Sequence, residues 1–321
     1  MSSGRSVVLR VELEDQYQER LRSEFPEVRF AVCTTDESLR ASLPEAEALV
    51  GGGPLADDLL TQARALRWIQ ATSAGVEGYD MDALRDRRIA LSTFSGIAAP
   101  NIAEHVLALI LAFARGLPAL LAGQAKRHWL GEAEAPPTFE LGGQTLGIVG
   151  LGDIGQELAW RAADLGMRVL AVDQHAEPSR GVERVLRTEQ LPELLAAVDH
   201  LALCLPLTEQ TRHLIGTEQL ATLRRSAYLY NVGRGEVLDQ QALIVALQGG
   251  ALAGAGLDVA SPEPLPDDSP LWQLPNVIIT SHSAAHTPKY WERGIELLID
   301  NTRRFLAGEE LRNLVDPGAG Y

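Results

Sequence analysis

Three polar side chains of the sequence are suited to proton transfer and to binding a carboxylate. Arg234, Glu263 and His282 each lie in a polar segment that directly follows an apolar run. An arginine can bind a carboxylate through two parallel hydrogen bonds and polarise an adjacent carbonyl. A histidine can donate or accept a proton near neutral pH, and a neighbouring carboxylate orients the ring and favours its charged form. The three together suit acid/base chemistry on a small organic acid.

Each of these residues also has a purely structural interpretation. Arg234 could cap a helix, Glu263 could be a solvated acid in a proline-rich loop, and His282 could be a core histidine. His286 is then the alternative proton donor. The remaining histidines are expected to be structural or to lie on the surface; they are His105, His128, His175, His200 and His213.

A glycine pattern predicts a dinucleotide-binding turn. The segment GIVGLGDIGQELA places Gly150, Gly152 and Gly155 in the order GxGxxG, after an apolar run and before an amphipathic helix. The first glycine allows the tight turn, the second lets the backbone approach a pyrophosphate, and the third lets helix and strand pack closely. The pyrophosphate would bind the free N–H groups at the helix N-terminus.

An acid at the end of the next predicted strand bears on the choice of cofactor. Asp173 can accept hydrogen bonds from the ribose hydroxyls and repel a 2′-phosphate, so it favours NAD over NADP. Arg180 lies nearby and leaves NADP possible. With a nicotinamide present, the arginine, glutamate and histidine suit hydride transfer between the cofactor and a 2-oxo or 2-hydroxy acid.

The elements that must position these residues alternate between strand-like and helix-like patterns. Such alternation predicts an α/β fold with parallel sheets covered on both faces. Because ligands bind beyond the carboxyl ends of parallel strands, the three polar segments should converge at one sheet edge. The predicted strands are 6–11, 28–32, 48–50, 146–149, 168–172, 200–203, 228–231, 254–258 and 277–280. The predicted helices are 15–23, 57–65, 101–115, 154–165 and 289–306, and residues 261–275 are predicted to form a loop. Glu104, in the apolar helix 101–115, is expected to be buried with a structural partner.

The chain resembles the D-isomer-specific 2-hydroxyacid dehydrogenases, a family that includes glyoxylate/hydroxypyruvate reductases. The resemblance covers nearly the whole chain and rests on motifs in the family's order. Besides GLGDIG they are SAGVEGYD (73–80), NIAEHVLALIL (101–111), LCLPLTEQTRHLI (203–215), NVGRGEVLD (231–239), LDVASPEPLPDDSPLW (257–272) and PNVIITSHSAAHT (275–287). Alanines replace the common glycine pair after His282, and Ser281 replaces the common proline before it.

The resemblance implies a role for individual residues. Arg234 would bind the substrate carboxylate with the backbone of Ala74 and Gly75, while His282, paired with Glu263, would exchange the proton and contact the substrate. Asp258 would lie near the nicotinamide carboxamide. The other residues expected to contact the cofactor are Asp153, Ile154, Leu205, Pro206, Thr211, Val232 and Ala284, together with His282.

The resemblance also implies two doubly wound, Rossmann-like or flavodoxin-like domains with the active site in the cleft between them. Residues 1–100 and 287–321 would form the substrate-binding domain, and residues 101–286 the NAD(P)-binding domain. A homodimer would be built around the helix at Asn101 and the arm that follows it.

Composition restricts the remaining possibilities. With 321 residues and a net charge of −15, the chain is not expected to bind nucleic acid or an anionic membrane. Two widely separated cysteines and no signal-peptide pattern favour the cytoplasm, and no His, Asp or Glu cluster has the spacing of a metal site. The alternatives are a phosphoglycerate, formate or phosphite dehydrogenase and a cofactor-sensing corepressor of the same fold. A Rossmann methyltransferase would leave the arginine, glutamate and histidine unexplained.

Overall fold

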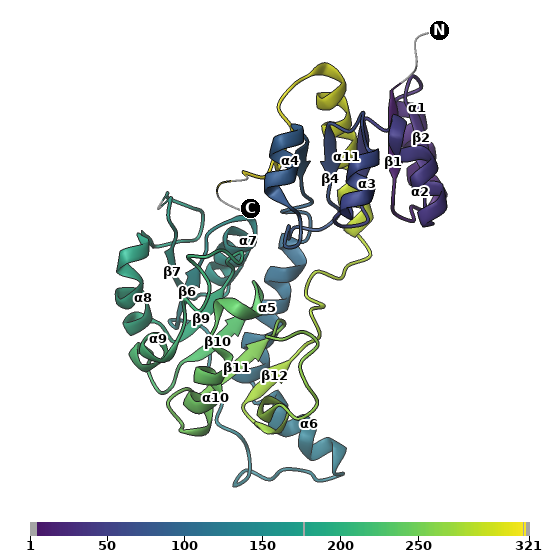
Figure 1. The fold of residues 1–321 in the computed structure, drawn as a ribbon. Helices are drawn as coiled ribbons and strands as arrows, with labels where there is room; N and C mark the ends of the chain where they lie inside the picture. The colour runs from purple at the N-terminus through teal and green to yellow at the C-terminus, as the bar shows by residue number, and fades with distance from the viewer. Residues whose placement is uncertain (1–4, 176, 317, 319–321) are drawn as a thin grey trace. The chain divides into compact units, whose positions relative to one another are not determined.

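The chain divides into two compact units, each built on a parallel sheet (Figure 1). The computed structural model describes residues 5–175, 177–316 and 318. One unit contains Met1–Ile97 and Pro288–Tyr321, and the other contains Ala98–Thr287. The predicted fold class is confirmed, because both units are doubly wound α/β structures.

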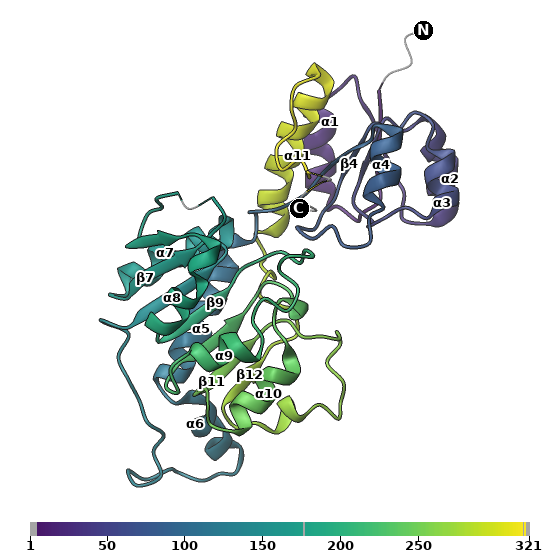
Figure 2. The same ribbon diagram turned by 60° about the vertical axis from the view of Figure 1, so that its left-hand side comes forward.

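The first unit has a five-stranded sheet in the order β2-β1-β3-β4-β5, the flavodoxin-like arrangement. Helices α1 and α11 cover one face, and α2, α3 and α4 cover the other (Figure 2). Buried leucines and valines from both sheet faces pack against the apolar side of each helix. The strands are β1 Ser6–Leu9, β2 Arg29–Val32, β3 Ala48–Val50, β4 Trp68–Gln70 and β5 Ala90–Ser92. The helices are α1 Asp15–Glu24, α2 Asp36–Ser42, α3 Asp57–Gln62, α4 Met81–Arg87 and α11 Tyr290–Ala307, with a 3-10 turn at Leu43–Glu45.

The second unit has a seven-stranded sheet in the order β12-β11-β10-β9-β6-β7-β8. The order reverses between β6 and β9, which is the point where open α/β sheets bind dinucleotides. Helices α5 and α7 cover one face, and α8, α9 and α10 cover the other. The strands are β6 Thr145–Val149, β7 Arg168–Val172, β8 Arg184–Leu186, β9 His200–Leu203, β10 Tyr228–Asn231, β11 Gly254–Leu257 and β12 Val277–Ile279. The helices are α5 Ala99–Ala114, α6 Leu117–Ala125, α7 Asp153–Asp164, α8 Leu191–Ala197, α9 Thr217–Thr222 and α10 Gln240–Gln248, with 3-10 turns at Thr188–Gln190, Gly235–Val237 and Pro270–Gln273.

Helix α5 begins and ends where its sequence indicates. Pro100 lies in its first turn, where a missing N–H costs no hydrogen bond. Gly116 adopts a left-handed φ of 63°, and α6 leaves at 74° to α5. No single helix in the described ranges is long and apolar enough to cross a membrane, although this bent pair would qualify by length and composition.

The structure differs from the sequence prediction in several details. Strands β4, β5 and β8 were not predicted. Each has three residues, too few to show alternation, although β3 and β12 of the same length were predicted from their apolar runs. The loop at 261–275 contains a 3-10 turn. Glu104 was expected to be buried but is exposed, and it pairs with Arg161 of α7 at 3.5 Å. The apolar pattern of α5 hid this solvent-facing position.

Candidate active site

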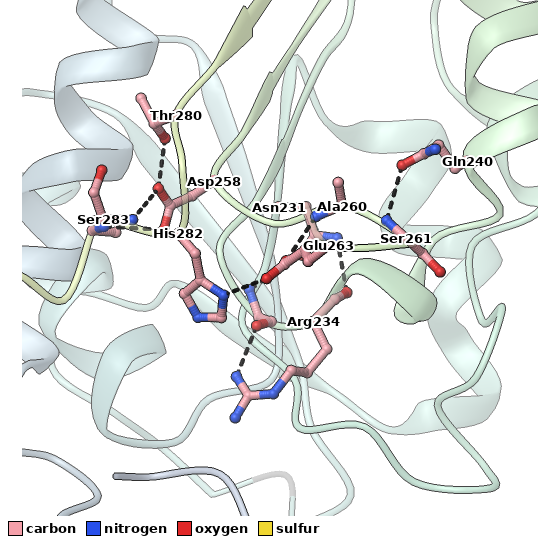
Figure 3. A network of polar contacts seen from close by, with 12 residues as sticks. Asn231, Arg234, Gln240, Asp258, Ala260, Ser261, Glu263, Thr280, His282 and Ser283 are labelled. Carbon is pink, nitrogen blue, oxygen red and sulfur yellow. Dashed lines mark hydrogen bonds and ion pairs between the residues drawn. The ribbon is translucent and has the colours of Figure 1, made fainter. Parts of the chain in front are cut away.

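The loops after β11 and β12 bring together a histidine and a glutamate of the second unit (Figure 3). Nδ1 of His282 lies 2.8 Å from Oε2 of Glu263. The other carboxylate oxygen of Glu263 accepts a hydrogen bond from the N–H of Ala260 at 2.9 Å, which fixes the carboxylate within its loop. Both side chains remain partly accessible, at 50% for the histidine and 36% for the glutamate. The pair can therefore hold a proton and still reach a ligand.

The turn after β10 holds Arg234 beside this pair. Asn231 donates through Nδ2 to the carbonyl of Arg234 and accepts through Oδ1 from the N–H of Gly233. Nη1 of the guanidinium donates to the carbonyl of Gly233 at 2.9 Å. Figure 3 shows the guanidinium and the imidazole of His282 extending toward the same side of the loops that carry them. A Cβ at Gly235 would lie 1.9 Å from the carbonyl oxygen of Ala260, so this turn requires a glycine.

Asp258, at the end of β11, organises the loop that carries His282. Its side chain is buried, and its Oδ1 accepts hydrogen bonds from the hydroxyl of Thr280 and the N–H of Ser283. Oδ2 accepts from the N–H of Ala284, and the backbone carbonyl of Asp258 accepts from the N–H of His282. The carboxylate thus anchors a backbone in which His282 has a left-handed φ of 52°. A non-glycine residue at positive φ is uncommon and needs such support.

The glycine turn after β6 has the geometry that its pattern predicts. Gly150 has a φ of +94°, and a Cβ there would lie 2.9 Å from Leu205. A Cβ at Gly155 would lie 2.2 Å from the carbonyl oxygen of Gly150, so helix α7 packs directly on the turn. No atom lies within 4 Å of a Cβ built on Gly152, which leaves open space above this backbone. The first intrahelical bond of α7 runs from Gln156 to Gly152, so the preceding amides point out of the helix end.

Asp173 lies directly after β7 and faces the same turn. Its Oδ2 accepts from the N–H of Leu151 at 2.8 Å, and its Oδ1 accepts from the N–H of His175 at 2.9 Å. Arg180 lies on the face of Trp160, with 4.9 Å between its Cζ and the ring centroid. The acid therefore lies at the turn itself, whereas the arginine contacts helix α7.

The other residues predicted to contact the cofactor belong to the same unit. The hydroxyl of Thr211 donates to the carbonyl of Pro206 at 2.7 Å and closes the turn after β9. Leu205 packs in the core beneath that turn, and Val232 and Ala284 are buried beside the loops described above. Asp153 and Ile154 form the first turn of α7.

Ala74 and Gly75 lie in the other unit, in the loop after β4. The hydroxyl of Ser73 donates to the carbonyl of Gly75 at 2.9 Å. Their predicted contact with the substrate carboxylate stays a prediction.

Sequence reasoning missed the residues that hold the site together. Asn231 and Thr280 support the loops, but an asparagine or threonine at a strand end is too common to indicate such a role. His105, on α5, lies 3.0 Å from the hydroxyl of Thr280 through Nε2. His286 is exposed, and its N–H donates to the carbonyl of Ser283.

The buried His200 and the half-buried Cys204 have strongly shifted pKa values. Burial lowers the pKa of His200 from 6.5 to about 4, against the smaller opposing effect of the Asp199 charge. Burial raises the pKa of the Cys204 thiol to about 12. Neither group is suited to proton exchange at neutral pH, so His200 is structural.

Comparisons with known proteins identify the family. Residues 107–284 match the family described as D-isomer specific 2-hydroxyacid dehydrogenase, NAD binding domain. A glyoxylate/hydroxypyruvate reductase B from Yersinia enterocolitica is 37% identical, with 97% of each chain covered. The chain belongs to the D-isomer specific 2-hydroxyacid dehydrogenase family.

Solved structures of this family share the fold. A family member from Aeromonas salmonicida has a TM-score of 0.84 and 32% identity, over 98% of this chain and 100% of the other. A structure described as an NADPH-dependent glyoxylate/hydroxypyruvate reductase from Sinorhizobium meliloti, in complex with NADP and sulfate, has a TM-score of 0.84 at 26% identity. It covers 99% of this chain and 100% of the other.

As a member of this dehydrogenase family, the protein is an NAD(P)-dependent 2-hydroxyacid dehydrogenase. The residues present fit the dinucleotide. The open backbone at Gly152, the N-terminus of α7 and the acid at Asp173 are the features that a bound pyrophosphate and ribose require.

Proposed function

We propose that this dehydrogenase reduces a small 2-oxo acid to a D-2-hydroxy acid, reversibly, with NADH. The supporting observation is the His282–Glu263 pair at 2.8 Å beside Arg234, beyond the carboxyl ends of β10, β11 and β12. An acid/base histidine next to a carboxylate-binding arginine suits the reduction of a carbonyl adjacent to a carboxylate.

His282 is the proposed proton donor. Nδ1–H donates to Glu263, which fixes the tautomer and leaves Nε2 to face the substrate. In the described part of the chain, Nε2 has no hydrogen-bond partner. The ring is the proposed donor of the proton that the carbonyl oxygen receives. The nicotinamide, when bound, supplies the hydride that the carbonyl carbon receives.

Arg234 is the proposed anchor for the substrate carboxylate. Its guanidinium presents several N–H donors in one plane, which suits two parallel hydrogen bonds to a carboxylate. The same positive charge favours negative charge that develops on the neighbouring carbonyl oxygen during reduction. In a chain of net charge −15, such a localised cation favours the binding of an anionic carboxylate at this point.

Glyoxylate and hydroxypyruvate are the proposed substrates. These are the acids named in the description of the Yersinia relative, which is 37% identical along nearly the whole chain. Both are short 2-oxo acids that differ at the substituent on the carbonyl carbon, so discrimination between them depends on small differences in pocket shape.

NADH is the proposed preferred cofactor, with NADPH as a possible alternative. Asp173 is held at the glycine turn by two backbone N–H groups, where its charge would oppose a 2′-phosphate. Kinetics with both cofactors should give a higher kcat/KM with NADH. A higher value with NADPH would show that the influence of Arg180 outweighs that of Asp173.

A cytoplasmic homodimer is the proposed form of the protein. Helix α6 and the segment after it expose several large apolar side chains, a pattern that marks protein interfaces. They are Leu117, Leu120, Leu121 and Trp129, the last at 93% exposure. Location in the cytoplasm rests on the sequence composition and stays a prediction.

Oxidation of NADH, measured against a panel of 2-oxo acids from glyoxylate to phenylpyruvate, tests the proposed function. The variant His282→Asn should lower kcat by about 10²- to 10⁴-fold while the NADH dissociation constant barely changes. The matched control His286→Asn should stay near the wild-type rate. Loss of turnover in the control, with near-normal turnover in His282→Asn, would assign the proton to His286. No reduction of any 2-oxo acid by the wild type would contradict the proposed substrate class.

A further inference from the structure

Helix α5 contributes two hydrogen bonds to the loop that carries His282. Nδ2 of Asn101 donates to the carbonyl of Ala284 at 2.7 Å, and Nε2 of His105 lies 3.0 Å from Oγ1 of Thr280. Positions four residues apart lie on the same face of a helix, so one face of α5 holds both ends of this short loop.

The contact of His105 continues to a buried carboxylate. The Thr280 hydroxyl donates to Oδ1 of Asp258 at 2.6 Å, so its oxygen accepts from Nε2–H of His105. Nε2 is also 3.7 Å from that Oδ1, and Asp258 has a side-chain exposure of 3%. Nε2 of His105 is thus a polar group of α5 that lies close to both Thr280 and this carboxylate.

The carboxylate of Asp258 in turn fixes the backbone next to the proton donor. It accepts from the N–H groups of Ser283 and Ala284, while its own carbonyl accepts from the N–H of His282. His282 has a φ of 52°, a conformation that needs to be held by its surroundings. The chain of contacts from His105 therefore ends at His282, the proposed proton donor.

We propose that His105 is a positioning residue, which acts through Thr280 and Asp258 to hold His282 in its productive orientation. This inference rests on the proposed function for the role of His282. His105 contacts neither that ring nor Glu263, so its effect is on geometry and not on the proton itself. Removal of its N–H takes away the hydrogen bond that the hydroxyl oxygen of Thr280 accepts. It also takes away a polar neighbour 3.7 Å from the carboxylate of Asp258.

Two substitutions at His105 separate positioning from general damage to the helix. His105→Leu removes the donor, whereas His105→Gln keeps an N–H at a similar distance from the backbone. Glu104→Ala is the matched control, because this neighbouring residue pairs with Arg161 and makes no contact with the loop. With saturating NADH and hydroxypyruvate, the leucine variant should lose roughly 10- to 100-fold in kcat. The glutamine variant should recover most of this loss, the control should match the wild type, and the dissociation constant of NADH should stay the same in all four.

Amide hydrogen exchange of peptides covering residues 281–286 tests the same inference without turnover. The leucine variant should exchange roughly 2- to 10-fold faster there, because the amides of this loop lose support, while the control and the glutamine variant should not. Unchanged exchange in the leucine variant, or a kcat within about twofold of wild type, would overturn the positioning role. An equal loss in Glu104→Ala would do the same. Absence of turnover in the wild type would instead contradict the proposed function and leave the exchange result decisive.

Discussion

Lowering the pH should destabilise this protein through one buried histidine, His200. The side chain is fully buried on β9, where Nδ1 lies 3.0 Å from the hydroxyl of Tyr230 and Nε2 lies 3.2 Å from Oε1 of Gln144. The glutamine oxygen can only accept, so Nε2 carries the hydrogen and Nδ1 accepts from the tyrosine. Protonation would put a charge among the rings of Phe139, Tyr228 and Tyr230 and break the bond from the Tyr230 hydroxyl.

The size of the effect follows from the pKa of His200, which burial lowers from 6.5 to about 4. Above pH 6.5 neither the folded nor the unfolded state binds the proton, and His200 makes no pH-dependent contribution. As the pH falls from about 6.5 to about 4, the unfolded state binds a proton that the folded state does not, so stability decreases. At about 1.4 kcal/mol for each pH unit, the total loss is about 3 kcal/mol by pH 4.

Urea denaturation gives the free energy of unfolding of the wild type and of His200→Phe across this pH range. The difference between the two isolates the contribution of His200, because both proteins share the other titrating groups. At pH 7 the variant should be less stable by about 1–3 kcal/mol, since two buried polar partners lose their hydrogen bonds. As the pH falls to 4, this difference should move by about 3 kcal/mol in favour of the variant. Parallel curves for wild type and His200→Phe would refute the reasoning.

Three further outcomes follow from the geometry. Gly152→Ala should change the free energy of unfolding by no more than about 0.5 kcal/mol, but it should weaken NADH binding at least about tenfold. Gly155→Ala should instead lower the free energy of unfolding by roughly 1–3 kcal/mol, because the added Cβ would lie 2.2 Å from the carbonyl oxygen of Gly150. Fluorescence titration and thermal melting measure the two effects, and a Gly155→Ala variant as stable as the wild type would contradict the packing. Cys204, with its pKa raised to about 12, should resist iodoacetamide at pH 8 in the native protein and react in urea; peptide mass spectrometry after native labelling should find it unmodified. Replacing exposed Leu121 and Trp129 by serine should shift sedimentation toward the monomer, and an unchanged sedimentation coefficient would place the proposed interface elsewhere.

Local patterns were sufficient to predict the glycine turn and most of the strands. The strand before Gly150, the helix after Gly155 and the acid at Asp173 follow from residue types within a few positions of one another. Strands β4, β5 and β8 were missed because their stability comes from neighbouring strands. Glu104 was misplaced because an almost entirely apolar helix gives a weak indication of which side faces solvent.

The sequence by itself determined which residue types are available for chemistry and that they follow successive parallel strands. The tertiary structure decided which of them meet. It places Glu263 against Nδ1 of His282, and it links His105 through Thr280 to Asp258. A hydrogen bond needs two atoms about 3 Å apart in the right direction. That distance depends on the register of β10, β11 and β12 and on the packing of α5, to which residues far apart in the chain contribute. Sequence spacing contains no direct measure of it.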